Sequence, residues 1–289
     1  GIMAYNNMYY WYGQYMVEGE IGNSAQVGVS VYSSKDLYQW KNEGIALAVV
    51  ENNDDHPIAK GCILERPKVI FNKKTGKFVM WFHLELKGQG YKAAKTGVAV
   101  ADQPTGPYEF LDAMNPNAGQ WPIGYPEELK TKQFSDTLEW WTDEWRQAVT
   151  EGLFIHRDFE KGQMARDMTL YVDDDGTAYH IHASEENLTL HISELNDEFT
   201  DFTGKYIQVF PAGHNEAPSI FKRNGKYYMI TSGCTGWDPN AARLLVSDSV
   251  MGKWEYVNNP CIGEDKDLTF HSQSTFILPV PGKKDAFIF

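Results

Sequence analysis

The stretch NEAPSIFKRNGKYYMITSG, Asn215 to Gly233, reads as two short β-strands joined by a tight turn. An apolar run, Ala217 to Phe221, and an aromatic run, Tyr227 to Ile230, flank Asn224-Gly225, the dipeptide most typical of a two-residue β-hairpin. Glu216 is the unusual residue, because a carboxylate stands at the start of a strand whose other residues are predicted to be buried. Its role has to be sought outside the hairpin itself.

Hairpins similar to this one recur along the chain. Close copies run from Lys68 to His83 and from Thr169 to Ser184, and partial copies run from Gly1 to Gln14 and from Thr275 to Phe289. In each copy an apolar strand, a turn rich in Gly, Asn, Asp or Lys, and an aromatic strand follow one another. The sequence therefore contains five copies of one hairpin.

A second hairpin pattern follows most of these copies, with an alternating strand, a polar turn and a strand that carries Trp, Tyr or Phe. It covers Val27 to Gly44, Thr96 to Asp112, Leu188 to Gly204 and Arg243 to Asn259. Two hairpins in tandem make a four-stranded antiparallel sheet, and five such sheets predict an all-β fold, a five-bladed β-propeller. A β-sandwich is the alternative, but it does not require one four-strand order to repeat.

We expect residues 1–289 to form a single propeller domain that is truncated at both ends. The first-blade position equivalent to Glu216 falls about two residues before Gly1, and Phe289 lies midway through the fifth blade. One region departs from the repeat: residues 115–164 are predicted to be an insertion between the second and third blades.

The insertion is expected to be partly helical. Pro and Gly at its start indicate a loop, whereas SDTLEWWTDEWRQAV has helical spacing and begins with Ser135 as a candidate N-cap. Three tryptophans, Trp140, Trp141 and Trp145, lie close together here. Packing of the insertion onto the rest of the chain is the favoured interpretation of these rings, and lining of a sugar-binding cleft is the alternative.

The composition limits the classes of partner. A net charge of −13 argues against nucleic acid and anionic membrane surfaces, which require clustered Lys and Arg. No apolar run approaches the roughly 18 residues of a membrane span. Three cysteines allow at most one disulfide.

Four polar residues occupy equivalent places in the repeat. Glu216 and Asp167 each precede the turn glycine of their hairpin by nine residues, Glu65 precedes its glycine in a longer turn, and Gln273 holds a matching place before the last hairpin. The first strands of propeller blades run beside the central axis, so these side chains are predicted to converge. Carboxylates gathered in this way repel one another, and such clusters are kept mainly for catalysis or for cation binding.

A purely structural explanation of these acids is also open. Arg66 and Arg166 directly adjoin Glu65 and Asp167, which would permit a ring of salt bridges. Neighbouring residues of a strand point to opposite faces, however, so each Arg is a poor partner for the acid beside it.

Three segments together resemble a known family: ERPKVIFN from Glu65, RDMTLYVDDDGTAYHIHAS from Arg166, and NEAPSIFKRNGKYYMITSGCTGW from Asn215. In this order they resemble the five-bladed propeller glycosidases of glycoside hydrolase family 43, most of all its galactan-directed branch. The resemblance covers nearly the whole chain.

This resemblance implies hydrolysis with inversion of the anomeric carbon, with Glu216 as the general acid and Asp167 as the residue that tunes the acid and touches the sugar. Most of the family uses a first-blade Asp as the base; here that position precedes Gly1, and Gln273 becomes the candidate for positioning the water. Inversion needs the acid and the water-holding group roughly 6.5–9.5 Å apart.

The resemblance also suggests sugar contacts. The candidate substrate-binding residues are Glu65, Arg166, Thr235, Trp237 and His271. No cofactor is expected, although a structural Ca²⁺ in the central channel near His271 is an alternative. His180 and His182 alternate on one strand and are interpreted as structural rather than as metal ligands.

The expected function is that of an exo-acting glycoside hydrolase that removes terminal galactose from β-1,3-galactan or from the side chains of plant-type polysaccharides. Alternatives on the same scaffold are an arabinofuranosidase, a xylosidase, a galactofuranosidase and a non-catalytic carbohydrate-binding propeller. The expected partner is an oligosaccharide or polysaccharide, the expected state is a monomer, and the substrate class suggests a location outside the cytoplasm.

Overall fold

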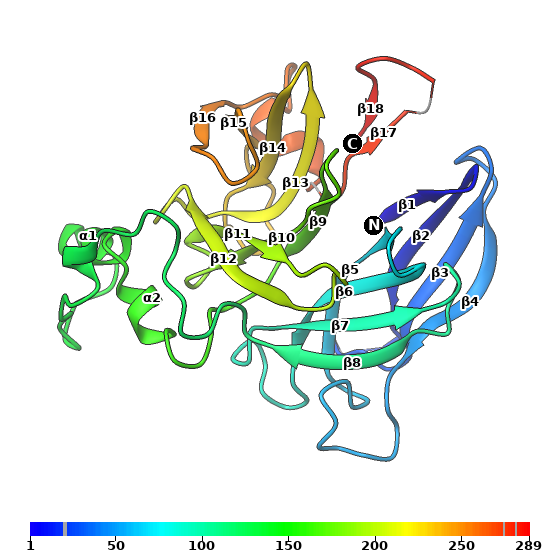
Figure 1. The fold of residues 1–289 in the computed structure, drawn as a ribbon, viewed down its shortest axis with the longest axis horizontal. Helices are drawn as coiled ribbons and strands as arrows, with labels where there is room; N and C mark the ends of the chain where they lie inside the picture. Colours follow the sequence, from blue (N-terminus) through cyan, green and yellow to red (C-terminus); the bar gives the residue numbers. More distant parts are fainter. Residues whose placement is uncertain (20–21, 274, 281) are drawn as a thin grey trace. The chain divides into compact units, whose positions relative to one another are not determined.

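The computed structural model describes residues 1–19, 22–273, 275–280 and 282–289. Within these residues antiparallel β-sheets dominate, and four of the sheets contain four strands each (Figure 1). In every four-stranded sheet the strands lie in the order in which they occur in the chain.

The first sheet contains β1 (Ile2–Tyr5), β2 (Met8–Tyr15), β3 (Gly28–Ser34) and β4 (Lys41–Ala48). The second contains β5 (Ile63–Asn72), β6 (Lys77–Glu85), β7 (Lys95–Ala101) and β8 (Glu109–Met114). The third contains β9 (Met168–Val172), β10 (Ala178–Ser184), β11 (Thr189–Leu195) and β12 (Phe202–Val209). The fourth contains β13 (Glu216–Arg223), β14 (Lys226–Ser232), β15 (Arg243–Ser247) and β16 (Glu255–Asn258).

The predicted unit of two hairpins in tandem is thus confirmed, but the number of complete blades is corrected. Four blades are complete, and the fifth predicted hairpin forms a two-stranded sheet of β17 (Leu278–Pro279) and β18 (Phe287–Ile288). The Pro-Gly turn predicted between these strands includes residue 281, which lies outside the described residues.

The chain forms two compact units. Unit 1 comprises Gly1–Met114, Ala165–His180 and Leu195–Asp201, and unit 2 comprises Asn115–Met164, Ile181–Glu194 and Phe202–Phe289.

The core of unit 1 lies between the first two sheets. Strand β3 contributes Val29 and Val31, and β6 contributes Phe78, Met80 and Phe82 to one buried cluster. Eight of the nine residues of β6 are buried, because side chains on both of its faces are covered. Strand β5 contacts β1 and β2 of the first sheet and also β9 of the third, as expected for strands that begin their blades.

The predicted turns form with the expected backbone. Asn224 and Gly225 have φ values of 51° and 76°, the left-handed pair that a type I′ hairpin turn requires. In the segment Asp173-Asp174-Asp175-Gly176, the backbone amide of Gly176 donates to the carbonyl of Asp173 at 3.0 Å. This segment is therefore a hairpin turn, as predicted.

The insertion contains the 3-10 helix η1 (Glu127–Leu129) and the helices α1 (Asp143–Thr150) and α2 (Leu153–Arg157). A second 3-10 helix, η2 (Lys266–His271), precedes the last sheet. The prediction of Ser135 as N-cap was wrong: the Thr142 hydroxyl caps α1 by accepting from the backbone amide of Trp145 at 3.2 Å. Trp141 has a φ of 75°, so a right-handed helix cannot pass through it.

Packing is confirmed as the role of Trp145. Its ring is buried in a cluster with Val149, Phe154 and Leu188. Trp140 stacks on this ring with 5.0 Å between centroids, and Trp141 stacks on His214 at 5.2 Å. Both of these outer rings are about half exposed.

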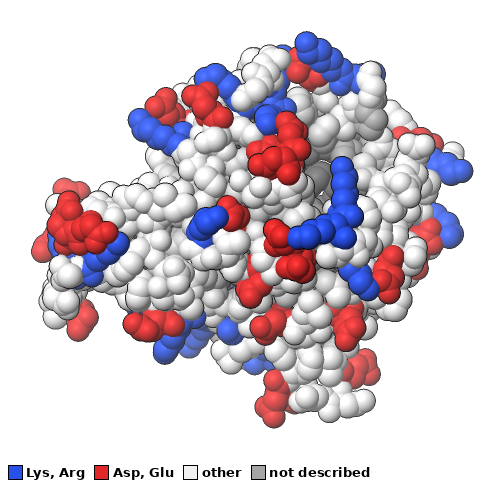
Figure 2. All heavy atoms as spheres, viewed as in Figure 1, with Lys and Arg blue, Asp and Glu red and all other residues white. Residues whose placement is uncertain are grey.

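The surface carries charges of both signs. On the face drawn in Figure 2, Lys and Arg side chains are interspersed with Asp and Glu. Among the described residues, no helix is long and apolar enough to cross a membrane.

Gly97 on β7 provides a test of the packing between neighbouring strands. A Cβ at this position would lie 2.3 Å from the ring of Phe82, its cross-strand partner on β6. We expect Gly97→Ala to lower the free energy of unfolding by about 1–3 kcal/mol, because the added methyl overpacks the sheet. Urea unfolding followed by fluorescence measures the change.

Gly13 is the matched control, since it also lies inside a strand and a Cβ there would meet no atom within 4 Å. Gly13→Ala is expected to change stability by less than about 1 kcal/mol. Equal losses in the two variants would contradict the packing of Phe82 against Gly97.

Candidate active site

Glu65 and Glu216 stand in the same local geometry in two different blades. Glu65 pairs with His83 across β5 and β6, and the register then shifts before Lys68. Glu216 pairs with Ser232 across β13 and β14, and the register shifts before Ser219. The two predicted positions are therefore equivalent in backbone as well as in sequence.

The residue after each glutamate is left-handed, with φ values of 56° for Arg66 and 47° for Ala217, and a proline follows it. A proline disfavours the right-handed helical conformation in the residue before it. The resulting bulge breaks the alternation of the strand and redirects side chains. The prediction that Arg66 is a poor partner for the adjacent Glu65 is confirmed, because Arg66 pairs with another acid.

Arg66 forms an ion pair with Asp167, which precedes β9. Its Nε lies 3.0 Å from Oδ1 and its Nη2 lies 2.8 Å from Oδ2, a two-pronged arrangement that is specific to Arg and carboxylate. The structural explanation of the acids is thus partly confirmed: Asp167 has an Arg partner. That partner comes from the second blade, and Arg66 does not pair with the adjacent Glu65.

A second cation lies close to this pair. The side chain of Lys68 is buried in β5, and its Nζ donates to the backbone carbonyl of Arg66 at 3.2 Å. Burial, with the charge of Arg66, lowers the pKa of Lys68 to about 7, while Asp167 acts in the opposite direction. Asp167 therefore lies close to two basic side chains, Arg66 and Lys68.

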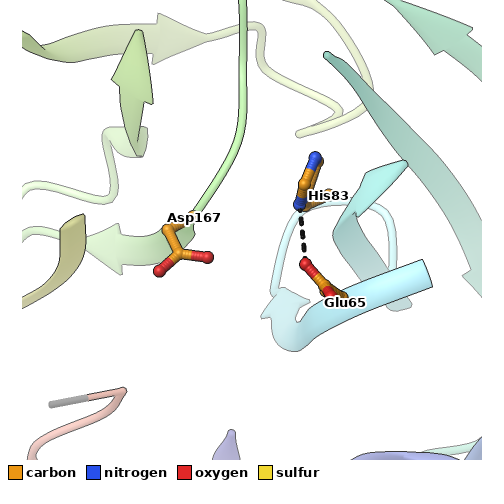
Figure 3. Close-up of side chains that lie close together, drawn as sticks. All are labelled: Glu65, His83 and Asp167. Atoms are coloured by element: carbon orange, nitrogen blue, oxygen red, sulfur yellow. Dashed lines mark hydrogen bonds and ion pairs between the residues drawn. The ribbon is translucent and has the colours of Figure 1, made fainter. Parts of the chain in front are cut away.

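Glu65 receives two side-chain donors. The hydroxyl of Tyr91 donates to Oε1 at 2.8 Å, and Nδ1 of His83 lies 3.2 Å from Oε2. Figure 3 shows Glu65 and His83 pointing toward one another from their strands, with Asp167 nearby. The convergence predicted for Glu65 and Asp167 is confirmed, because one carboxylate oxygen of each residue and one ring nitrogen of His83 all lie within 4.8 Å of one another.

This trio has ligand types suited to a cation, and its carboxylates already have partners in the structure. Both oxygens of Asp167 face the guanidinium of Arg66, and both oxygens of Glu65 accept hydrogen bonds. A cation that binds Asp167 would lie close to the positive charge of Arg66, which would oppose its binding. We describe the group as a network in which Arg66, His83 and Tyr91 contact the two carboxylates.

In unit 2, Glu216 contacts a neutral donor. Nδ2 of Asn187 donates to its Oε1 at 2.9 Å. Asn187 lies in the turn between β10 and β11, where Glu185, Glu186 and Asn187 all have φ values between 50° and 61°. Three consecutive left-handed residues other than glycine are unfavourable unless the surroundings hold them.

Glu185 supplies that restraint. Its carboxylate is fully buried and accepts from three side chains: His191 at 2.8 Å, Gln208 at 2.7 Å and Thr189 at 3.1 Å. Because these bonds fix the first residue of the turn, they also fix Asn187 against Glu216.

Gln273 lies beside Glu216 through a shared neighbour. The amide Nε2 of Gln273 donates to the hydroxyl of Ser232 at 3.0 Å, and Ser232 is the cross-strand partner of Glu216. Unit 1 therefore brings Glu65 and Asp167 together, and in unit 2 Ser232 is a common neighbour of Glu216 and Gln273. The convergence of all four stays a prediction.

The other sequence candidates have different surroundings. The Thr235 hydroxyl donates to the carbonyl of Asp238 at 2.6 Å, within its own loop. Trp237 is 91% exposed. Arg166 donates from Nη2 to the carbonyl of Tyr91 at 2.8 Å, and His271 is exposed at the end of η2.

His180 and His182 are both buried, which fits their interpretation as structural residues. Nε2 of His180 lies 3.1 Å from the Thr96 hydroxyl, and burial lowers the pKa of His180 to about 3. The ring of His182 packs on that of His191 with 5.5 Å between centroids.

Sequence reasoning missed His83, Asn187 and Ser232. His83 and Ser232 were within reach, because counting outward from each hairpin turn pairs them with Glu65 and Glu216. Asn187 had no such pattern, since its contact with Glu216 joins residues 29 positions apart through a turn of unusual backbone.

Comparisons with known proteins identify the family. The model of glycosyl hydrolases family 43 matches residues 141–276. A solved GH43 β-1,3-galactosidase, BT3683 with galactodeoxynojirimycin, is 55% identical, with a TM-score of 0.94, covering 97% of this chain and 81% of its own. The chain belongs to glycoside hydrolase family 43, whose solved members support the propeller class.

More distant structures are exo-β-1,3-galactanases. That of Clostridium thermocellum is 33% identical (TM-score 0.73), covering 98% of this chain and 51% of its own. One from Phanerochaete chrysosporium, solved with β-1,3-galactotriose, is 29% identical (TM-score 0.73), covering 96% of this chain and 53% of its own.

Among curated proteins, a β-D-galactofuranosidase of Aspergillus niger is 31% identical over 93 residues, which is 32% of this chain and 26% of that protein. The chain thus spans most of the β-1,3-galactosidase, about half of the galactanases and about a quarter of the galactofuranosidase.

The Arg66–Asp167 pair can be tested by stability. We expect Arg66→Gln to lower the free energy of unfolding by about 2 kcal/mol, because it removes two charge-assisted hydrogen bonds from a largely buried carboxylate. Chemical denaturation of the two proteins gives the difference.

The exposed ion pair of Lys74 with Asp197 serves as control, since both of its side chains are more than half exposed. Lys74→Gln is expected to lower stability much less than Arg66→Gln does, because solvent screens an exposed ion pair. A loss at Arg66 no larger than the loss at Lys74 would show that Asp167 does not depend on its guanidinium partner.

Proposed function

We propose that the protein is an inverting, exo-acting glycoside hydrolase that removes a terminal galactose, from β-1,3-galactan or from galactose-bearing side chains of plant-type polysaccharides. The observation that carries this proposal is the equivalent bulge that follows Glu65 and Glu216 at the start of their blades. Asp167 faces a guanidinium, whereas Glu216 accepts from the neutral amide of Asn187. The galactosidase and galactanases described above supply the choice of sugar.

In the proposed reaction Glu216 is the general acid and protonates the leaving oxygen as the glycosidic bond breaks. Nδ2 of Asn187 donates to Oε1 of this carboxyl group and helps to hold it in place. A water attacks the opposite face of the anomeric carbon and gives a product of inverted configuration. Gln273, whose amide nitrogen donates to the Ser232 hydroxyl, is proposed to hold that water.

Asp167 and Glu65 are proposed to bind the sugar as ionised hydrogen-bond acceptors. Asp167 would also act on the acid as a neighbouring negative charge, which favours its protonated form. The exposed ring of Trp237 suits stacking on a sugar face. Thr235, Arg166 and His271 are proposed as further substrate contacts.

The number of blades, the partner, the oligomeric state and the location are also proposals. A fifth blade that includes β17 and β18 would give the five-bladed propeller expected from the repeat. The partner would be an oligosaccharide or polysaccharide bound by a monomer, and polysaccharide breakdown would place the protein outside the cytoplasm. Size-exclusion chromatography with light scattering tests the monomer.

The substrate is tested by analysing the products formed from β-1,3-galactan, arabinan, xylan and aryl glycosides, including a galactofuranoside. Proton NMR during the first minutes should show α-galactose released from a β-linkage. Release of galactofuranose would instead favour the activity of the Aspergillus niger relative. Oligosaccharide binding with no product after long incubation would indicate a non-catalytic binding propeller.

Glu216→Gln tests the acid. We expect kcat/KM on a β-1,3-linked galactose disaccharide to fall by about a hundredfold or more, because the amide cannot donate the proton. The loss should be much smaller on a dinitrophenyl galactoside, whose leaving group needs no protonation. Steady-state kinetics on both substrates measures the contrast.

Glu194→Gln is the matched control, because Glu194 pairs with Lys205 at 2.9 Å on β11 of the same unit. It should leave both rates unchanged. Full activity of Glu216→Gln on the disaccharide would reject the assignment of the acid.

We further propose that catalysis needs no metal, because Arg66 already occupies the anionic face of Asp167. Treatment with EDTA is expected to leave kcat/KM unchanged. A structural Ca²⁺ near His271 would lower the thermal unfolding temperature on chelation without changing the rate of the folded enzyme. A loss of rate that added Ca²⁺ restores would contradict metal-free catalysis.

A further inference from the structure

His83 is a buried residue with a carboxylate at each ring nitrogen. It lies on β6, 1% exposed, opposite Glu65 on β5. Nδ1 is 3.2 Å from Oε2 of Glu65, and Nε2 is 2.9 Å from Oε1 of Glu85. Glu85 is fully buried, and its other oxygen accepts from the backbone amide of Ala94 at 2.8 Å.

The two carboxylate contacts determine the charge of the His83 ring. Ionised carboxylates only accept hydrogen bonds, so each ring nitrogen that meets one must carry a hydrogen. The form of His83 that satisfies both contacts is the imidazolium. A neutral ring would leave one carboxylate without its donor, and for the buried Glu85 that loss is costly.

The other groups that face His83 are consistent with a positive ring. Tyr91, whose ring centroid lies 6.0 Å away, donates to Glu65 and accepts from Asn23 at 2.7 Å. Asp167 is near, but Arg66 pairs with it. Burial by itself would lower the pKa of His83, but the hydrogen bonds and negative charges of Glu65 and Glu85 outweigh it, so the pKa is raised above its usual value of 6.5.

We propose that His83, kept as an imidazolium by the buried Glu85, is a positioning residue that orients the carboxylate of Glu65 toward the sugar and makes sugar binding weaken as the pH rises. This inference rests on the proposed function, in which Glu65 contacts the terminal sugar. His83 itself acts only through Glu65 (Figure 3).

The sign of the pH effect follows from the direction of the shift. A histidine with a raised pKa stays charged through neutral pH and loses its proton above it. Below that transition Glu65 has a charged donor on Oε2 and the phenol of Tyr91 on Oε1. Above it the donor on Oε2 is neutral or lost, so KM should rise while kcat changes little.

Glu85→Gln tests the proposal without touching Glu65 or His83. The amide can donate to Nε2, which removes the need for an imidazolium and leaves a neutral ring to donate from Nδ1 to Glu65. We expect KM for the galactoside to rise about tenfold at pH 6, with kcat within about threefold of wild type. The rise of KM between pH 6 and 9 that we expect for the wild type should disappear.

Thr96→Val is the matched control, since Thr96 is the buried cross-strand partner of His83 on β7 and its hydroxyl contacts His180 instead of Glu65. It should lower stability and leave the pH profile of KM unchanged. Glu85→Gln with a wild-type pH profile, or with a loss in kcat alone, would overturn the positioning role.

If Glu85→Gln does not fold, or if no product forms, two other measurements test the role of His83. NMR titration of wild-type histidines, with the His83 signal assigned by its loss in His83→Gln, should place the His83 transition above pH 6.5. A transition below that value would overturn the proposal. Calorimetry of D-galactose binding across the same pH range gives the second measurement.

These readouts separate the two proposals. A protein that neither releases nor binds galactose contradicts the proposed function. Galactose binding that does not weaken as the pH rises contradicts only the role of His83.

Discussion

A shift of register directly after a glutamate governs the placement of the reactive side chains in both units. After Glu65 and after Glu216, one left-handed residue and a proline interrupt the pairing of the strand with its neighbour. Because the strand loses its strict alternation at this point, the glutamate faces its cross-strand partner and the residue after it is free to turn elsewhere. In the second blade that residue is Arg66, and it reaches Asp167 at the start of the next blade.

The partners of the carboxyl groups differ from one acid to the next. Asp167 faces a guanidinium and Glu65 faces an imidazole and a phenol, whereas Glu216 meets the amide of Asn187. Inverting hydrolysis needs one carboxyl group that delivers a proton and others that remain charged. The backbone repeat places similar acids in successive blades, and their neighbours make them chemically different.

Local patterns were enough to predict the hairpins and the equivalence of the acids. Asn224-Gly225 forms its predicted turn, and Trp145 packs as expected, because turn conformation and burial of an aromatic ring depend on nearby sequence. The helix start at Thr142 was missed because the left-handed Trp141 excludes the earlier residues from the helix. The Arg66–Asp167 pair was missed because only pairs between neighbouring residues were considered, and this pair joins residues 101 positions apart.

The sequence by itself determined the repeated four-stranded sheet, its turns, and the equivalent positions of Glu65, Asp167, Glu216 and Gln273, since all of these follow from periodicity and short spacing. Only the tertiary structure decided which group each acid meets. His83 bridges Glu65 to Glu85, and Asn187 reaches Glu216 from a turn held by the buried Glu185. Such contacts join residues far apart in the chain, and a bulge or a left-handed turn decides them through backbone angles that composition and spacing do not encode.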